Sequence, residues 1–317
     1  MKISYDYKNK NCRSEASEIG YRYIYEDDNG KISVNTHSNE NGLLITINNC
    51  NITEFSDNAT KLPMFNGLNL NVYLMGSSHT VVGHSQSFRT VGSFIISKPW
   101  DSNIHFSSPT IVHSIGITLL KNSFKLSFAP EHTDKIVGLV YNKFFSDSQT
   151  FKMDCVCLAY CYGIDELGKN GFRDDEKLNE LVSGLALRLY KSEVIQLSDD
   201  DYRDHMIADR ICVDLLSSLD RECDLDRIYR KNDVDKYKAN RLFKNRYGMP
   251  PYAFHKYHRL LKAGGLLLTG ETNMETVAYK VGYVSESKFA ESFKRQFKIR
   301  PKHFRECLIE ECLKTVE

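Results

Sequence analysis

Short hydrophobic runs, separated by Asn, Gly, Ser and Pro, dominate the first 130 or so residues of the chain. Each run is rich in Val, Ile, Phe and Tyr, which favour extended strands, and each is too short for a helix. The predicted strands are Gly42–Asn48, Asn69–Gly76, His79–Gly83, Gly92–Ser97, Asn103–Ser107 and Val112–Leu119. Several short strands at this spacing predict a β-sandwich or a small barrel.

A helical pattern replaces the strands in the middle of the chain. Between Asp174 and Ile195, hydrophobic residues recur every three or four positions, which places them on one face of a helix. These residues are Leu178, Val182, Leu185 and Leu189. Such a stripe either packs within its own fold or forms a dimer seam, and the sequence leaves both interpretations open. A similar pattern predicts a further helix over Arg203–Leu219.

The change from strands to helices predicts an α+β protein with three parts. Residues 1–130 form a β-rich effector-binding domain, residues 131–200 a helical linker or dimerisation segment, and residues 201–317 an all-α domain. With 317 residues, 41% of them hydrophobic, the chain is large enough to build a core in each half.

The segments that direct proteins to membranes or out of the cell are missing from the pattern. No hydrophobic run is long enough to span a bilayer, and the N-terminus lacks the hydrophobic stretch of a signal peptide. Nine cysteines without a repeating spacing favour reduced thiols and a cytoplasmic location. Cys155, Cys157 and Cys161 lie close together, but their hydrophobic neighbours favour a buried segment over a metal site.

The C-terminal third contains an internal repeat with an offset of 50 residues. The matching pairs are Phe243-Lys244 with Phe293-Lys294, Tyr247 with Phe297, Pro251 with Pro301, and Phe254 with Phe304. A repeat of this length indicates a duplicated supersecondary unit, here in two copies.

Each copy has the pattern of a helix-turn-helix unit. In the second copy a helix over Met274–Val281 precedes Gly282, which suits a tight turn because glycine readily adopts a left-handed backbone. Ser285 or Ser287 then caps a second helix. That helix carries a core stripe of Phe289, Phe293 and Phe297, while in the first copy Asp235 is the expected cap. A helix over Tyr252–Leu268 connects the two copies.

Positive charge is concentrated in this region. Residues 236–305 contain 16 Lys and Arg but only 4 Asp and Glu, whereas the whole chain has a net charge of +1. A basic helix-turn-helix module suits double-stranded DNA, whose phosphates it neutralises and whose major groove accepts the second helix of each unit. The predicted DNA-binding residues are Lys236, Tyr237, Lys238, Asn240, Arg241, Lys244, Ser285, Ser287, Lys288, Glu291, Ser292 and Arg295.

The same region resembles the AraC/XylS family of bacterial transcription regulators. The resemblance rests on residues 206–307, and the second copy carries it best. Its matching residues are Val277-Ala278, Val281-Gly282-Tyr283, Ser285, Ser287, Phe289, Phe293-Lys294, Phe297, Pro301 and Phe304-Arg305. The first copy matches at Arg241, Phe243-Lys244, Gly248 and Pro251, and the connecting helix at Arg259, Ala263 and Leu266-Leu267.

Four features depart from the family pattern. Tyr229 replaces a small alanine in the first copy, and Asp233 replaces the turn glycine. Lys298 replaces the glycine that closes the second copy. Gly264-Gly265 lies inside the connecting helix, where each glycine costs about 1 kcal/mol relative to alanine. The first copy is therefore expected to pack differently from the family average.

The resemblance implies a mechanism and a partner. Two recognition helices enter successive major-groove segments of DNA, about one helical turn apart, and an activator of this family also contacts RNA polymerase. The N-terminal half is implied to be a cupin-like sensor for a small-molecule effector, with a homodimer possible. The stretch Gly67–Gly76 resembles the siderophore-responsive members, which implies a ferric siderophore as effector. Tyr73, Phe94 and Trp100 are candidate effector-binding residues.

Other classes of function have less support from the residues. The chain has no nucleophile elbow, phosphate loop, dinucleotide fingerprint or paired metal ligands, so we predict neither an enzyme nor a protein with a metal or cofactor. The remaining alternative is a constitutive dimeric or architectural DNA-binding protein without an effector.

Overall fold

A computed structural model of the chain describes residues 12–17, 20–27, 30–52, 67–82, 85–97, 110–145, 150–197 and 205–316. It divides into two compact units. Unit 1 consists of residues 1–154, 167–199 and 312–317, and unit 2 of residues 155–166 and 200–311. The expected linker, residues 131–200, is therefore not one separate segment, because most of it groups with unit 1 and residues 155–166 group with unit 2.

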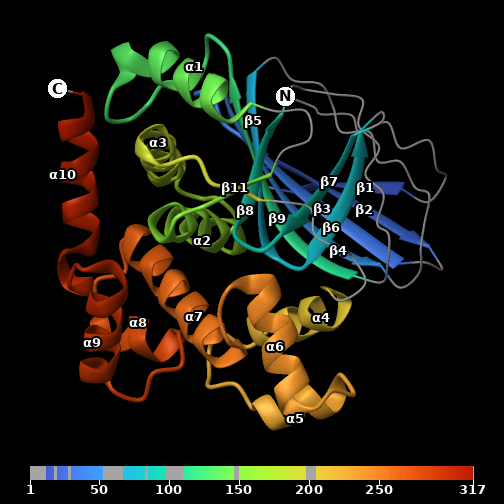
Figure 1. Cartoon of the computed structure of the whole chain (residues 1–317). Helices are drawn as coiled ribbons and strands as arrows, with labels where there is room; N and C mark the ends of the chain where they lie inside the picture. The colour runs from blue at the N-terminus through green and yellow to red at the C-terminus, as the bar shows by residue number, and fades with distance from the viewer. Residues whose placement is uncertain are drawn as a thin grey trace. The chain divides into compact units, whose positions relative to one another are not determined.

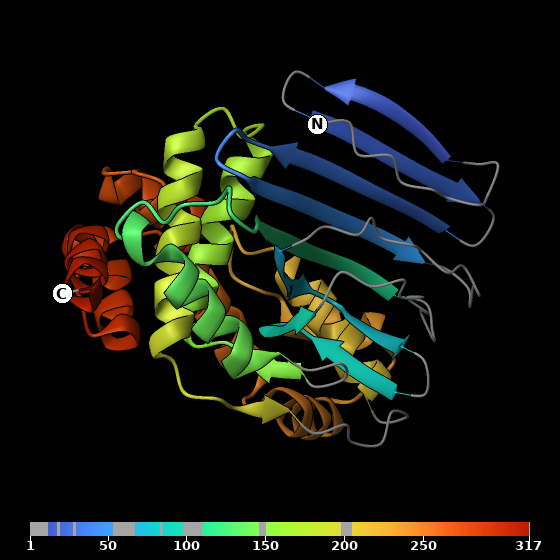
Figure 2. The same ribbon diagram turned by 90° about the horizontal axis from the view of Figure 1, so that it is seen from above.

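Unit 1 is built on an antiparallel sheet, as Figures 1 and 2 show. Among the described residues, nine strands pair in the order β1-β2-β3-β4-β9-β5-β8-β10-β11, and β6 and β7 form a separate two-stranded ribbon. The strands are β1 Cys12–Ser17, β2 Gly20–Asp27, β3 Gly30–Ser38, β4 Leu43–Ile52, β5 Gly67–Met75, β6 Ser77–Val82, β7 Ser85–Thr90, β8 Ser93–Ser97, β9 Thr110–Leu120, β10 Thr150–Lys152 and β11 Gln196–Leu197.

Five of the six predicted strands are present, four of them in the nine-stranded sheet and one in the ribbon. The runs at 42–48, 69–76, 79–83, 92–97 and 112–119 correspond to β4, β5, β6, β8 and β9. The predicted strand Asn103–Ser107 lies outside the described residues. The prediction missed β1, β2 and β3, whose hydrophobic residues are interrupted by Arg, Glu, Lys, Asn and Ser.

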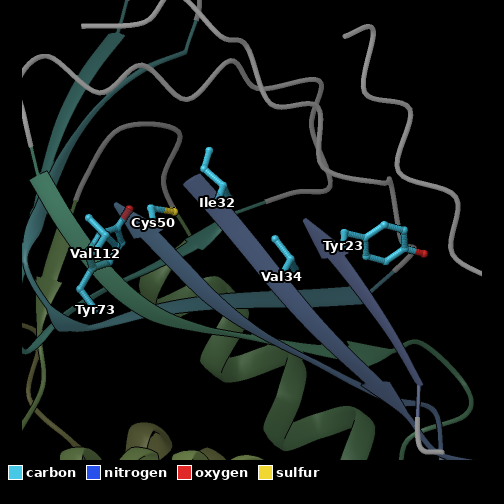
Figure 3. Packing of buried hydrophobic residues seen from close by; sticks show 6 residues of the cluster. All are labelled: Tyr23, Ile32, Val34, Cys50, Tyr73 and Val112. Carbon is cyan, nitrogen blue, oxygen red and sulfur yellow. The ribbon is translucent and has the colours of Figure 1, made fainter. Parts of the chain in front are cut away.

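A hydrophobic cluster covers one face of the strands β2 to β5 and β9. Figure 3 shows its six buried members. They are Tyr23, Ile32, Val34, Cys50, Tyr73 and Val112. Because side chains alternate between the two faces of a strand, Ile32 and Val34 reach this cluster while Ser33 points to the other face.

Helices α1 (Thr133–Phe144) and α3 (Asp175–Lys191) complete unit 1. The predicted stripe on α3 is buried within the chain, with Leu178, Val182, Leu185 and Leu189 all at most 2% exposed. This burial decides between the two interpretations of the stripe, because a buried face is not available as a dimer seam.

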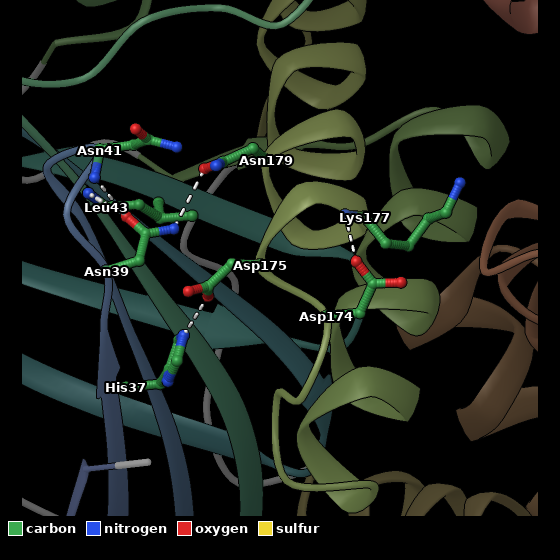
Figure 4. A network of polar contacts seen from close by, with 8 residues as sticks. All are labelled: His37, Asn39, Asn41, Leu43, Asp174, Asp175, Lys177 and Asn179. Atoms are coloured by element: carbon green, nitrogen blue, oxygen red, sulfur yellow. Dashed lines mark hydrogen bonds and ion pairs between the residues drawn. The ribbon is translucent and has the colours of Figure 1, made fainter.

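A polar network attaches the start of α3 to the end of β3 (Figure 4). Nε2 of His37 lies 2.7 Å from a carboxylate oxygen of Asp175, and the Asn39 amide donates to the Asn179 side chain at 3.2 Å. Asp174 caps the helix by accepting the backbone N–H of Lys177 at 2.8 Å.

Unit 2 is helical. It holds most of α2 (Cys155–Lys169), a helix that the sequence did not predict, and most of the last helix, α10 (Phe304–Val316). The helices between them are α4 His205–Leu216, α5 Leu225–Lys231, α6 Lys236–Tyr247, α7 Pro251–Leu268, α8 Met274–Lys280 and α9 Glu286–Phe297. Of the three cysteines expected to be buried in that segment, Cys157 and Cys161 are buried and Cys155 is partly exposed. Within the described residues, no helix has both the length and the hydropathy needed to cross a bilayer.

Candidate DNA-binding interface

Two helix pairs, α5 with α6 and α8 with α9, share the same turn. In the first pair the backbone N–H of Asp233 donates to Arg230 O and that of Val234 donates to Tyr229 O. In the second pair Gly282 donates to Tyr279 O and Tyr283 donates to Ala278 O. Asp233 (φ 49°) therefore takes the left-handed conformation that Gly282 (φ 75°) takes in the second turn.

Side chains cap the second helix of each pair. Asp235 accepts the backbone N–H groups of Tyr237 and Lys238, both at 2.9 Å, which confirms it as the N-cap of α6. Ser285 accepts the backbone N–H of Lys288 and is the N-cap of α9, so Ser287 is not the cap. After the shared turn, the second pair has one additional residue before its cap, and this residue is Val284.

The inner faces of α6 and α9 pack each helix pair onto a hydrophobic core within unit 2. Phe243 is buried and its ring centroid lies 5.1 Å from that of Phe254 on α7. In the second helix pair, the ring centroid of Phe293 lies 5.1 Å from that of Phe304, and Phe289 and Phe297 pack on either side of Phe293, as predicted. Both outer faces are thus turned away from a hydrophobic core.

The outer face of α6 carries five of its six predicted DNA-binding residues in exposed positions. They are Lys236, Tyr237, Lys238, Arg241 and Lys244. Asn240 is only partly exposed, and its amide donates to the backbone O of Lys236 at 2.7 Å and to the Tyr229 hydroxyl at 3.4 Å. Tyr229 is buried at the position that Ala278 occupies in the second helix pair, so its larger ring reaches under α6 to this amide.

The outer face of α9 carries Ser287, Lys288, Glu291 and Arg295 in exposed positions. Ser285 is partly exposed and serves as the cap. The expected outward orientation of Ser292 is wrong, because this side chain is only 8% exposed. It lies next to Phe293 and three positions after Phe289, at the edge of the buried stripe.

The second helix pair has two exposed hydrophobic residues that the sequence did not indicate as site residues. Tyr279 lies on α8, and Val284 lies directly before the cap of α9. Both are largely or fully exposed. Val284 is the extra residue between the turn and the cap of the second pair. This difference is recognised only when the two turns are aligned by their hydrogen bonds, so the sequence alone did not single it out.

Arg259 of the connecting helix holds the second turn. This buried side chain donates from Nε to the backbone O of Val281 at 2.6 Å. Its guanidinium carbon also lies 4.5 Å from the centroid of the Tyr283 ring, within the range of a cation–π contact. The turn before α9 is therefore fixed directly to α7.

The first helix pair is attached to α4 instead of α7 by its polar contacts. The Tyr247 hydroxyl at the end of α6 donates to a carboxylate oxygen of Asp209 on α4 at 2.6 Å. Arg246 lies 3.4 Å from the same oxygen. Polar contacts thus attach the first helix pair to α4 and the second helix pair to α7.

Two of the three candidate effector-binding residues, Tyr73 and Phe94, lie in the core of unit 1. Tyr73 belongs to the cluster in Figure 3. Phe94 is buried, with its ring centroid 5.1 Å from that of Phe144 and 5.7 Å from that of Phe151. Trp100 lies outside the described residues. Across the part of the chain that the structure describes, no group of three or more His, Cys, Asp and Glu side chains is arranged to hold a metal ion.

Known proteins are similar to parts of this chain. A family model described as a helix-turn-helix domain matches residues 230–306. The HTH-type transcriptional regulator AlkR of Acinetobacter baylyi is 41% identical over 73 residues, which are 23% of this chain and 24% of AlkR. The TetD protein of transposon Tn10 from Escherichia coli is 32% identical over 117 residues, which are 36% of this chain and 84% of TetD.

The extent of these matches differs between relatives. The chain spans only about a quarter of the length of AlkR but most of the length of TetD. Among solved structures, ToxT from Vibrio cholerae O395 aligns over 84% of this chain and 98% of its own, at 16% identity and a TM-score of 0.31. The match to the family model, residues 230–306, includes α6 to α9.

Proposed function

The chain belongs to the AraC/XylS family of transcription regulators, and from this premise we propose that it binds specific sites on double-stranded DNA through α6 and α9. The observation that carries the proposal is the pair of capped helices with exposed polar and basic outer faces, joined by a largely buried connecting helix within one unit. Each helix presents its N-terminal turns to a major-groove segment, and the two segments lie about one helical turn apart.

The exposed and partly exposed side chains of the two outer faces divide into two roles. Lys236 and Lys244 contact phosphates and set the register of the protein on DNA. Base edges are read by a second set of residues. This set is Lys238, Asn240 and Arg241 on α6 and Ser287, Lys288, Glu291 and Arg295 on α9. Arginine suits guanine, and glutamate accepts a hydrogen bond from cytosine.

The role proposed for unit 1 is to sense a small-molecule effector in the cytoplasm. A ferric siderophore is the effector class we propose first, from the resemblance of Gly67–Gly76. RNA polymerase is the partner if the protein is an activator, and a homodimer is the proposed assembly. A constitutive or architectural regulator is the alternative, and it differs in one respect: no ligand changes its DNA affinity.

The test is to capture genomic DNA fragments on the purified full-length chain at two salt concentrations and to sequence them. A recurring site with two major-groove segments that survives the higher salt supports the proposal. Random fragments that are lost as salt rises contradict it, because purely electrostatic binding is non-specific and falls steeply with salt.

A further inference from the structure

Most of helix α2 belongs to unit 2 although it precedes α4 in the sequence by more than thirty residues. Residues 155–166 cluster with residues 200–311. Ten consecutive side chains of α2, from Val156 to Asp165, are buried. A helix that is buried on all sides is a component of a core rather than a flexible linker.

The connecting helix α7 receives α2 at two glycines. A Cβ atom added at Gly265 would lie 2.6 Å from the backbone N of Gly163 and 2.8 Å from the carbonyl carbon of Tyr162. A Cβ added at Gly264 would lie 3.0 Å from the Cβ of Ala159. The two helices approach so closely that only glycine fits at position 265, which explains two glycines inside a helix that they weaken by about 1 kcal/mol each. We call this site the glycine notch.

A buried hydrogen bond sets the register of the crossing. The Tyr162 hydroxyl lies 2.8 Å from Nδ1 of His258, about two turns before the notch on α7. Burial lowers the pKa of His258 from 6.5 to about 3, with a smaller contribution from His255, so the imidazole is neutral at pH 7. Sliding α2 along α7 would break this bond and leave two buried polar atoms without it.

The other contacts of α7 lead to the two helix-turn-helix units. At its N-terminal end, Phe254 packs against Phe243 of α6. At its C-terminal end, the Cβ position of Gly264 lies 3.3 Å from Phe304 and 3.4 Å from Phe297, in the core below α9. The notch therefore holds α7 between α2 and the core of the second helix-turn-helix unit.

We propose that α2 is a positioning helix for DNA recognition. By filling the glycine notch and bonding His258, it holds α7 in place and thereby fixes the distance and angle between α6 and α9 on the DNA. The residues that act are Ala159, Tyr162 and Gly163, none of which contacts DNA. The proposal rests on the proposed function, because it requires both α6 and α9 to bind.

The test measures spacing selectivity in the full-length chain. A site selected from random DNA with the wild-type protein is rebuilt with its two segments one or two base pairs closer or farther apart. Wild-type protein is expected to bind about tenfold more weakly when the spacing changes by two base pairs, since each added or removed base pair changes both the distance and the rotation between the two DNA segments. For Gly265→Ala, the same change of spacing is expected to weaken binding less than about threefold relative to its own affinity at the selected spacing. The loss for Gly264→Ala is expected to lie between those of wild type and Gly265→Ala.

Two further measurements keep the outcome specific. Hydrogen exchange of the α2 amides is expected to accelerate in Gly265→Ala, because the added Cβ displaces α2. Gly138→Ala is the matched control, since this glycine also lies inside a helix but its Cβ would meet no described atom within 4 Å. It should behave as wild type on every spacing. Gly264→Ala, the milder change, supplies the result if Gly265→Ala does not fold.

Each result decides between positioning and simple stability. An equal loss of affinity on all spacings overturns the proposal, because a smaller folded fraction weakens every site alike. Unchanged spacing selectivity also overturns it, whether or not α2 exchanges faster. A wild-type protein that selects no discrete site contradicts the proposed function itself, which is a separate outcome.

Discussion

The Tyr162 hydroxyl lies 2.8 Å from Nδ1 of His258, and both side chains are buried in unit 2. Burial raises the pKa of Tyr162 and lowers that of His258, so both groups are neutral around pH 7. The bond joins residues 96 positions apart, and it connects α2 to α7, the helix between α6 and α9.

Removing the Tyr162 hydroxyl tests this bond. Tyr162→Phe keeps the ring but leaves Nδ1 of His258 buried without its partner, which costs about 1–3 kcal/mol in the free energy of unfolding. Urea unfolding followed by circular dichroism measures the loss. Tyr279→Phe is the control, because Tyr279 is exposed and its change should stay within about 0.5 kcal/mol. Equal effects in the two variants would show that the buried bond contributes nothing.

The low pKa of His258 predicts a stability that depends on pH. Its folded pKa of about 3 lies below the unfolded value of 6.5, so at pH values between them only the unfolded chain binds the proton. Stability from this residue is therefore complete above about pH 6.5 and falls as the pH drops towards 3, by about 1.4 kcal/mol per pH unit at most.

The measurement is the free energy of unfolding at pH 7.5, 6.5 and 5.5. His258→Gln is expected to be less stable than wild type at pH 7.5 but to show a flatter pH dependence, since glutamine does not titrate. His132→Gln, at a partly exposed position in unit 1, should keep the wild-type slope. Parallel slopes for wild type and His258→Gln would rule out His258 as the source.

Helices α6 and α9 end in the same backbone conformation with different residues. Gly248 (φ 76°) closes α6 and Lys298 (φ 62°) closes α9, and each donates its N–H to a carbonyl four residues earlier at 2.8 Å. A left-handed residue with a side chain costs about 1 kcal/mol more than glycine. Lys298→Gly should therefore raise the free energy of unfolding by about 1 kcal/mol.

Gly248→Ala is the reciprocal change and should lower it by about the same amount. A Cβ at Gly248 meets no described atom within 4 Å, so the expected loss comes from the backbone alone. Urea unfolding of both variants measures the pair. Changes of the same sign would contradict the interpretation that backbone strain distinguishes the two ends.

The C-terminal elements could be predicted from the sequence because local signals agree there. The Asp235 cap and the Gly282 turn were predicted from single residues, and both are present. The α7 helix begins at Pro251, one residue before its predicted start. Helix α2 could not be predicted in this way, because residues buried on all of its faces leave no periodic pattern.

Two of the predicted site residues are less exposed than their helical positions indicate. Ser292 is polar, yet its position beside Phe293 buries it. Asn240 has a helical position like that of its exposed neighbours, but Tyr229 from α5 reaches its amide. The purpose of Gly264-Gly265 is visible only when α2 lies across α7, because the glycines serve a contact and not a local conformation.

Val284 is expected to read a thymine methyl group. It is exposed, hydrophobic and directly before the cap of α9, the end of a recognition helix that approaches the bases. Replacing the thymine nearest this end by uracil removes one methyl group, which should weaken wild-type binding about fourfold if about 0.8 kcal/mol is lost. Val284→Ser should bind both DNAs equally, whereas the control Leu139→Ser, in α1, should keep the wild-type ratio. A fourfold ratio retained in Val284→Ser would exclude the contact.

Arg295 separates base reading from phosphate binding on α9. Its side chain is exposed on the outer face of the helix, where a guanidinium can bond two acceptors of one guanine. Arg295→Ala is expected to weaken binding by about 1–3 kcal/mol and to remove the preference at a single base pair, measured on a panel of single-base site variants at fixed salt. Arg173→Ala, an exposed arginine in unit 1, should change neither affinity nor preference. A loss that is uniform over the panel would instead assign Arg295 to a phosphate, because phosphate contacts carry no sequence information, and the salt dependence of binding would then decrease by about one ion.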